Sequence, residues 1–118
     1  MQMELHPGVY RSNVDSDEWQ ADPDVGGEVQ VFVDRQDSNV GMSRYLVDPG
    51  PVSWTPSVRE TLLVLEGSVR IDIEGGPSID LRVGDVASLP EGTRTTWHVT
   101  PPFRELWFAP RLLEPASS

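Results

Sequence analysis

The stretch Trp54-Thr-Pro-Ser-Val-Arg-Glu-Thr-Leu-Leu-Val-Leu-Glu-Gly67 decides how the rest of the chain is interpreted. One carboxylate, Glu60, precedes an apolar run that ends at Glu66 and Gly67. A short apolar run that ends at a turn residue is typical of a strand buried in a sheet. The stretch therefore predicts a strand with a single acid at the head of its apolar part.

The segments after this stretch alternate apolar and polar residues, which is the pattern of strands with one buried face. The alternation is clearest at 69–73 and 79–83. Turns rich in Gly and Pro separate these segments at 75–77 and 90–92, and a similar turn at 48–51 precedes the stretch. No window shows a sustained helical period, and many short strands separated by such turns predict an all-β sandwich or barrel.

Composition excludes several classes of function. The chain has 118 residues, the length of one domain, and a net charge of −10, which disfavours binding to nucleic acid or to anionic membranes. It contains no cysteine, which rules out disulfides, thiol catalysis and Cys-ligated metals. It also contains no lysine, so Schiff-base chemistry on a lysine is excluded.

The order of segments along the chain predicts one barrel with two appendages. We expect an N-terminal arm over 1–28, a β-barrel over 29–112 and a frayed tail over 113–118. The first residues have neither the basic nor the apolar region of a signal peptide, and no apolar stretch reaches the length of a membrane span. We therefore expect a cytoplasmic protein.

From about Gly50 onward the sequence resembles a cupin, a small double-stranded β-helix or jelly-roll barrel. The residues that match its first motif are Gly50, Trp54-Thr-Pro56, Glu60 and Gly67, and those that match its second are Gly84, Pro90-Glu-Gly92 and Thr95. With Trp97 after the second motif, the sequence resembles the branch of cupins named after the (S)-ureidoglycine aminohydrolase cupin domain. The resemblance covers roughly residues 41–109 and implies a cupin jelly-roll barrel preceded by an irregular arm.

The resemblance also implies four positions that hold a metal ion in metal-dependent cupins. Those positions carry Trp54, Pro56, Glu60 and Thr95. Only Glu60 is a strong ligand, whereas catalytic sites usually need three protein ligands, so we expect no metal cofactor. If Thr95 faces inward, strand alternation turns His98 outward. A metal-dependent enzyme of the ureidoglycine aminohydrolase type, with altered ligands that recruit His98 or His6, is the alternative.

Without metal ligands, these positions predict an aromatic cavity with one acid. The candidate pocket residues are Tyr45, Trp54, Pro56, Glu60, Leu62, Thr95, Trp97 and Trp107. Burial in such a cavity raises the pKa of a carboxyl group, so Glu60 is the candidate general acid or base. We expect a metal-free cupin domain that binds a small organic molecule, either as a binding protein or as an enzyme.

A rival interpretation is a plugged barrel with a structural or assembly role. Here Trp54 and Trp97 fill the interior, and Glu60 pairs with Arg44 or Arg70. The sequence leaves open whether the barrel is plugged or open. In either case we expect a homodimer, formed through a sheet edge such as the strand predicted at 29–33.

Overall fold

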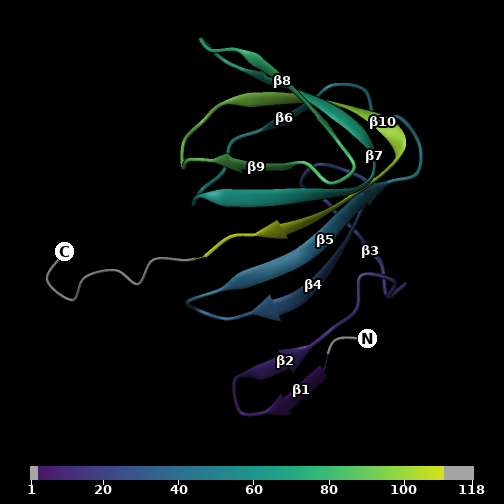
Figure 1. Cartoon of the computed structure of the whole chain (residues 1–118), viewed down its shortest axis with the longest axis vertical. Helices are drawn as coiled ribbons and strands as arrows, with labels where there is room; N and C mark the ends of the chain where they lie inside the picture. Colours follow the sequence, from purple (N-terminus) through teal and green to yellow (C-terminus); the bar gives the residue numbers. More distant parts are fainter. Residues whose placement is uncertain (1–2, 111–118) are drawn as a thin grey trace, which may run out of the picture.

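The structure, a computed structural model, describes residues 3–110, and all its regular elements are strands (Figure 1). The strands are β1 (Met3–His6), β2 (Val9–Arg11), β3 (Gln20–Ala21), β4 (Glu28–Asp34), β5 (Asn39–Tyr45), β6 (Val52–Trp54), β7 (Glu60–Ile73), β8 (Ser78–Arg82), β9 (Val86–Leu89) and β10 (Thr95–Phe108). The prediction of an all-β fold is confirmed. The tail predicted at 113–118, and residues 111–112 at the end of the predicted barrel, lie outside the described residues.

Two long strands, β7 and β10, join the two halves of the barrel. They pair antiparallel along most of their lengths, with an interruption between Thr100 and Arg104. On one side of the interruption they are flanked by β8 and β6, and on the other by β9 and β5. The strand order is β3-β4-β5-β10-β7-β8, with β6 beside β10 and β9 beside β7. Both long strands therefore contribute residues to both halves of the barrel (Figure 1).

Gly67 lies at this interruption and allows the two long strands to approach closely. Its φ of +73° is in the left-handed region that favours glycine. A Cβ atom there would lie 2.3 Å from the backbone oxygen of Pro102. The closing glycine of the opening stretch is thus required by backbone contact with β10.

The buried face of β7 changes phase at the same point. Leu62 and Val64 are buried before Gly67, and Val69 and Ile71 after it. The irregularity opposite, where β10 carries extra residues, absorbs the change so that both halves face one core. This phase places Glu60, two residues before Leu62, on the inner side of the barrel.

The segment expected as an N-terminal arm contains the β1–β2 hairpin and the short strand β3. The hairpin lies beside β4 at one end of the molecule (Figure 1). β3 pairs with Glu28 and Val29 at the start of β4. The following loop is tied to β5 because the Tyr45 hydroxyl donates a hydrogen bond of 3.0 Å to the backbone oxygen of Val25. The arm is therefore attached to the barrel wall.

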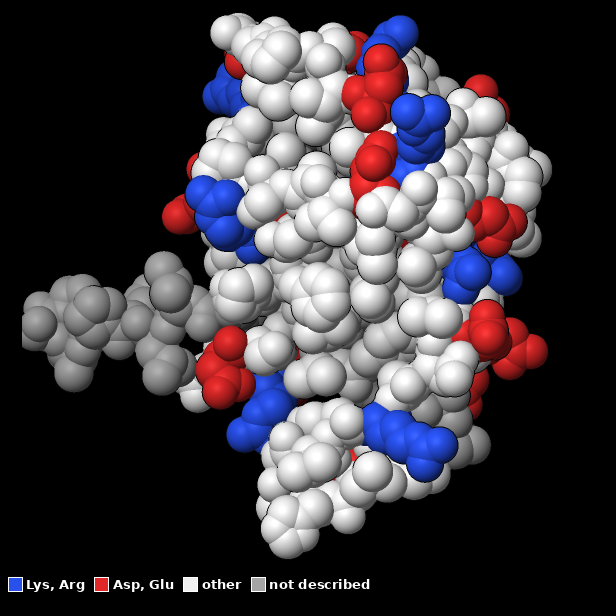
Figure 2. Space-filling view, in the orientation of Figure 1, with Lys and Arg blue, Asp and Glu red and all other residues white. Residues whose placement is uncertain are grey.

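The exterior carries charges of both signs. On the face shown in Figure 2, the basic side chains are separated from one another and interspersed with acidic ones. This face therefore shows no cluster of cations of the kind that nucleic-acid binding needs. Residues 3–110 contain no helix that could span a membrane.

Candidate functional site

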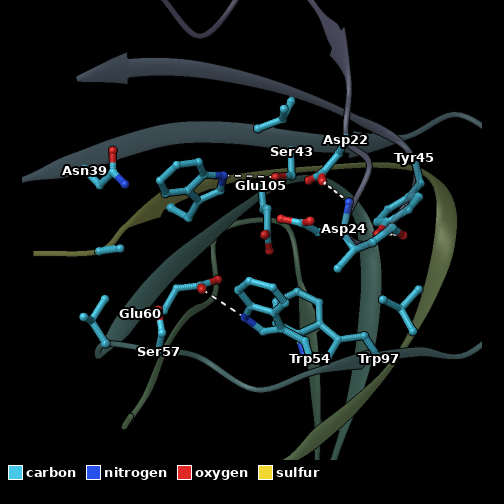
Figure 3. Close-up of a pocket in the computed structure, with 16 residues that line it drawn as sticks. Asp22, Asp24, Asn39, Ser43, Tyr45, Trp54, Ser57, Glu60, Trp97 and Glu105 are labelled. Atoms are coloured by element: carbon cyan, nitrogen blue, oxygen red, sulfur yellow. Dashed lines mark hydrogen bonds between the residues drawn. The ribbon is translucent and has the colours of Figure 1, made fainter. Parts of the chain in front are cut away.

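A cavity of about 370 Å³ lies inside the barrel (Figure 3). Its walls come from strands β4, β5, β6, β7 and β10 and from loop segments of the arm and of the β6–β7 connection. The aromatic residues of the lining are Tyr45, Trp54, Trp97 and Trp107. The tryptophans therefore surround an open space. In the plugged barrel that was the rival interpretation of the sequence, they would fill the interior.

The structure brings together five of the eight predicted pocket residues. Tyr45, Trp54, Glu60, Trp97 and Trp107 line the cavity. The other three, Pro56, Leu62 and Thr95, are buried outside its lining. They support the wall from behind instead of facing the cavity.

Hydrogen bonds fasten β6 to β10 at the positions where metal-dependent cupins carry ligands. Thr95 lies opposite Trp54 in the ladder, and its hydroxyl donates a hydrogen bond of 2.6 Å to the Trp54 backbone oxygen. The same hydroxyl accepts a hydrogen bond of 2.9 Å from Nε1 of Trp97. The backbone oxygen of Pro56 accepts another from the Gly92 amide at 2.9 Å. Thr95 and Pro56 thus hold strands and turns together.

Glu60 is one of two buried acids in the cavity wall. It is 9% exposed, and its Oε2 accepts a hydrogen bond of 3.0 Å from Nε1 of Trp54. Burial raises the pKa of Glu60, and the hydrogen bond from Trp54 opposes this effect. The suggested pairing with an arginine is wrong. Arg44 pairs with Glu28 and Arg70 with Asp72, because both arginines lie on other faces of the sheets.

Glu105 is the second buried acid, and it is not among the site residues predicted from the sequence. It is 5% exposed and points into the cavity from β10 (Figure 3). Within residues 3–110, its Oε2 has no hydrogen-bond partner. Burial raises the pKa of Glu105 well above its usual value, and the nearby Glu60 raises it further. Strand alternation could have identified it, since it lies two residues before Trp107.

Two further acids, Asp22 and Asp24, reach the cavity from the loop between β3 and β4. The Asp24 amide donates a hydrogen bond of 2.9 Å to Oδ1 of Asp22, which fixes a tight turn. No sequence pattern pointed to these residues. Their place depends on how the arm packs against the barrel, which local periodicity does not describe.

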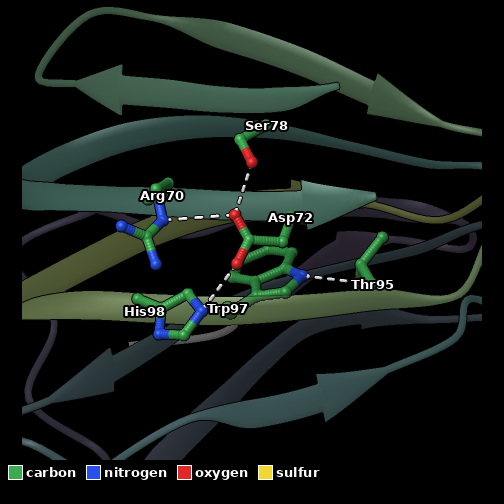
Figure 4. Close-up of polar contacts among 6 residues, drawn as sticks. All are labelled: Arg70, Asp72, Ser78, Thr95, Trp97 and His98. Carbon is green, nitrogen blue, oxygen red and sulfur yellow. Dashed lines mark hydrogen bonds and ion pairs between the residues drawn. The ribbon is translucent and has the colours of Figure 1, made fainter. Parts of the chain in front are cut away.

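His98 lies on the other side of β10 from the cavity (Figure 4). Its Nε2 is 2.8 Å from Oδ2 of Asp72, whose Oδ1 accepts hydrogen bonds from Ser78 and Arg70. His6 is exposed in β1, far along the chain from the barrel motifs. The proposed recruitment of His98 into the barrel is therefore wrong, because alternation along β10 turns it away from Trp97.

The donor set does not fit the metal ion that the cupin resemblance implies. Among the described residues, no group of three or more His, Asp or Glu side chains is arranged to hold a metal. At the four expected positions, only Glu60 offers a strong ligand, and the Thr95 hydroxyl already bridges Trp54 and Trp97. That the protein works without a metal stays a prediction.

Comparison with protein families identifies one match. Residues 36–105, more than half of the chain, match the family described as EutQ-like cupin domain. No protein with a curated description matches the sequence.

Solved structures with the same fold cover most of the chain. An ethanolamine utilization protein Q from Salmonella typhimurium LT2 has 22% identity and a TM-score of 0.78, covering 93% of this chain and 92% of its own. The Clostridium difficile EutQ protein has 15% identity and a TM-score of 0.75, and the match covers 94% of this chain and 87% of the EutQ chain. A cupin superfamily protein from Desulfitobacterium hafniense has 15% identity and a TM-score of 0.63, covering 71% and 76%. These likenesses confirm the predicted cupin jelly-roll fold, while the ureidoglycine aminohydrolase branch stays a prediction.

Proposed function

Since the chain belongs to the family of EutQ-like cupin domains, we propose that its barrel binds a small organic molecule without using a metal ion. The observation that carries the proposal is the cavity of about 370 Å³, walled by aromatic rings and by two buried acids. Small-molecule sites are concave and mostly apolar, with a few polar groups that orient the ligand. The cavity has this composition.

The unpartnered oxygen of Glu105 supports the proposal independently of the cavity's size. A buried polar atom that lacks a hydrogen-bond partner is costly, and native structures contain few of them. A ligand group in the cavity supplies the missing partner. The protein thus keeps an unfavourable feature at the place where a bound molecule would relieve it.

Glu60 gives the site the capacity for proton transfer. Burial raises its pKa, which brings a carboxyl group closer to the range where it can exchange a proton near neutral pH. Its hydrogen bond from Trp54 fixes the orientation of the carboxyl group. An enzyme that uses Glu60 as general acid or base is the catalytic form of the proposal.

The test is a screen of the intact protein and of two cavity variants against a metabolite library, by native mass spectrometry and thermal shift. We expect at least one metabolite to bind the parent and to bind Glu60→Gln and Trp54→Ala more weakly. The control is Glu91→Gln, which changes an exposed turn residue outside the cavity. Unchanged binding in both cavity variants, or no ligand in the library, would count against the proposal.

The two other functions considered from the sequence receive less support. A plugged structural barrel is at odds with the open space between Trp54, Trp97 and Trp107. A metal-dependent enzyme of the ureidoglycine aminohydrolase type lacks a suitable donor set in the described part of the chain. Elemental analysis that finds one metal ion per chain would favour the metal-dependent enzyme again.

A cytoplasmic homodimer is the setting that we propose for this site. β3 pairs with only the first two residues of β4, and Val31 further along β4 is 37% exposed. Such a strand can accept a strand from a second copy. A mass of one chain by light scattering at micromolar concentration would rule the dimer out.

A further inference from the structure

The charged groups that line the cavity all have the same sign. Four acids, Asp22, Asp24, Glu60 and Glu105, line it, and no arginine or histidine of the described chain does. A concave site lined by one sign of charge attracts ligands of the opposite sign and repels those of the same sign. The cavity therefore disfavours anionic molecules.

The hydrogen-bond donors on the aromatic rings are already used. Nε1 of Trp54 donates to Glu60 and Nε1 of Trp107 donates to Ser43, both at 3.0 Å. Nε1 of Trp97 donates to Thr95, and the Tyr45 hydroxyl donates to the backbone of the arm. These groups cannot donate to an anion without breaking bonds within the wall, but their ring faces remain available to apolar or cationic groups.

The acceptors, in contrast, include one that is unused. Oε2 of Glu105 lies in the wall of the cavity, in a side chain that is 5% exposed, and has no partner within residues 3–110. Figure 3 shows its carboxyl group directed into the space that Glu60 and Trp54 also face. A ligand that satisfies this oxygen needs a hydrogen-bond donor next to an apolar body.

We propose that the ligand is a small protonated organic amine, whose ammonium group binds between Glu105 and Glu60 while its carbon skeleton lies against the tryptophan rings. This inference rests on the proposed function and adds the chemical class of the ligand. An ammonium group carries the required charge and has several donors, so it can bond to both acids. Its hydrogen bonds to ionised acceptors are shorter and stronger than neutral ones.

Binding of an amine is coupled to release of a proton. In the empty cavity, burial and the proximity of Glu60 raise the pKa of Glu105, which favours its neutral form. The other titratable groups around the cavity are Tyr45 on β5 and Asp22 and Asp24 on the loop before β4. An incoming ammonium ion favours the carboxylate, so Glu105 loses its proton on binding. Affinity for an amine therefore rises with pH until Glu105 is ionised in the empty cavity as well, and it falls where the amine itself is deprotonated.

The test compares three compounds that share a phenyl ring and differ in charge: benzylamine, benzyl alcohol and benzoate. Isothermal titration calorimetry of the intact protein measures each affinity. We expect benzylamine to bind at least about tenfold more tightly than benzyl alcohol, and benzoate most weakly. Titration of benzylamine in two buffers of different ionisation enthalpy should give different heats, which reports the released proton.

Matched variants locate the effect. Glu105→Gln keeps the shape of the side chain and should weaken benzylamine at least about tenfold. It should weaken benzyl alcohol much less, because Gln keeps an oxygen acceptor and loses only the negative charge. Glu60→Gln is the second variant, with the same expected direction, in case the first does not fold. Glu91→Gln on the exterior should change neither compound.

The outcomes separate this inference from the proposed function. The inference that the ligand is an amine is wrong if benzyl alcohol or benzoate binds as tightly as benzylamine. It is also wrong if the library yields only neutral or acidic ligands that need Glu60 and Trp54. In both cases the proposal that the cavity binds a small molecule is kept. If no compound of any charge binds, both are wrong. Binding of benzylamine that is insensitive to Glu105→Gln and Glu60→Gln also overturns the inference.

Discussion

Replacing Glu105 by Gln should stabilise the protein, although it removes a charged residue from an acidic cavity. Glu105 is 5% exposed and one of its oxygens lacks a partner in the described chain. An unsatisfied buried polar group costs about 1–3 kcal/mol, and more when it is charged. Gln keeps the shape of the side chain but cannot ionise, so it removes the charged form that the folded state disfavours.

The effect should depend on pH with a defined sign. In the unfolded chain Glu105 has an ordinary pKa of 4.5, whereas in the folded protein its pKa is raised well above that value. Above pH 4.5 the folded state therefore holds more protons than the unfolded state, and the stability of the parent falls as the pH rises through the folded pKa. The advantage of Glu105→Gln should grow by up to about 1.4 kcal/mol per pH unit over this window.

Urea unfolding followed by tryptophan fluorescence, between about pH 5 and about pH 8, measures this difference. Glu60 also has a raised pKa, but it is present in both proteins, so its contribution largely cancels. Glu91→Gln is the control, because Glu91 is exposed and should give a small difference at every pH. If Glu105→Gln is less stable than the parent at all pH values, or its advantage does not grow with pH, then Glu105 is well solvated or paired, and the reasoning fails.

Three other changes test the fold and the wall of the cavity. Gly67→Ala should lower the free energy of unfolding by roughly 2 kcal/mol more than Gly84→Ala. Both glycines have a positive φ, but only at Gly67 would a Cβ atom collide with the backbone of Pro102. Equal losses for the two variants in urea unfolding would refute this close approach. Leu62→Ala, at a fully buried position, should cost about 2–5 kcal/mol in the same assay, and a loss below about 1 kcal/mol would mean that the core is not packed there. Trp54→Phe removes the hydrogen bond that lowers the pKa of Glu60, so that pKa should rise in an NMR titration, and a fall would show that the bond is absent.

The strands and the family could be predicted because both depend on local signals. The apolar run after Glu60 identified the strand that begins there, and Gly84 marked a turn between two strands. Gly67, which was expected at the end of that strand, lies within β7 instead. These features are set by backbone geometry and by one buried face, so they can be read from neighbouring residues. The change in the buried face of β7 at Gly67 could not be predicted in this way, because it depends on contact with Pro102 in a distant strand.

The site was only partly predictable, because several of its residues come from distant parts of the chain. Glu60 and Trp54 follow from the motif, and both line the cavity. Glu105 could have been found by extending the alternation from Trp107, whereas Asp22 depends on how the arm folds over the barrel. The pocket was therefore expected to have one acid, while its lining contains four.

A crystal structure of the protein with benzylamine bound would test the central claim most directly. We predict density for the amine inside the barrel, with its nitrogen within hydrogen-bond distance of Oε2 of Glu105 and of the Glu60 carboxyl group, and with its ring against the tryptophans. A barrel without the amine, an interior filled by the protein's own side chains, or an amine bound only on the exterior would contradict this prediction.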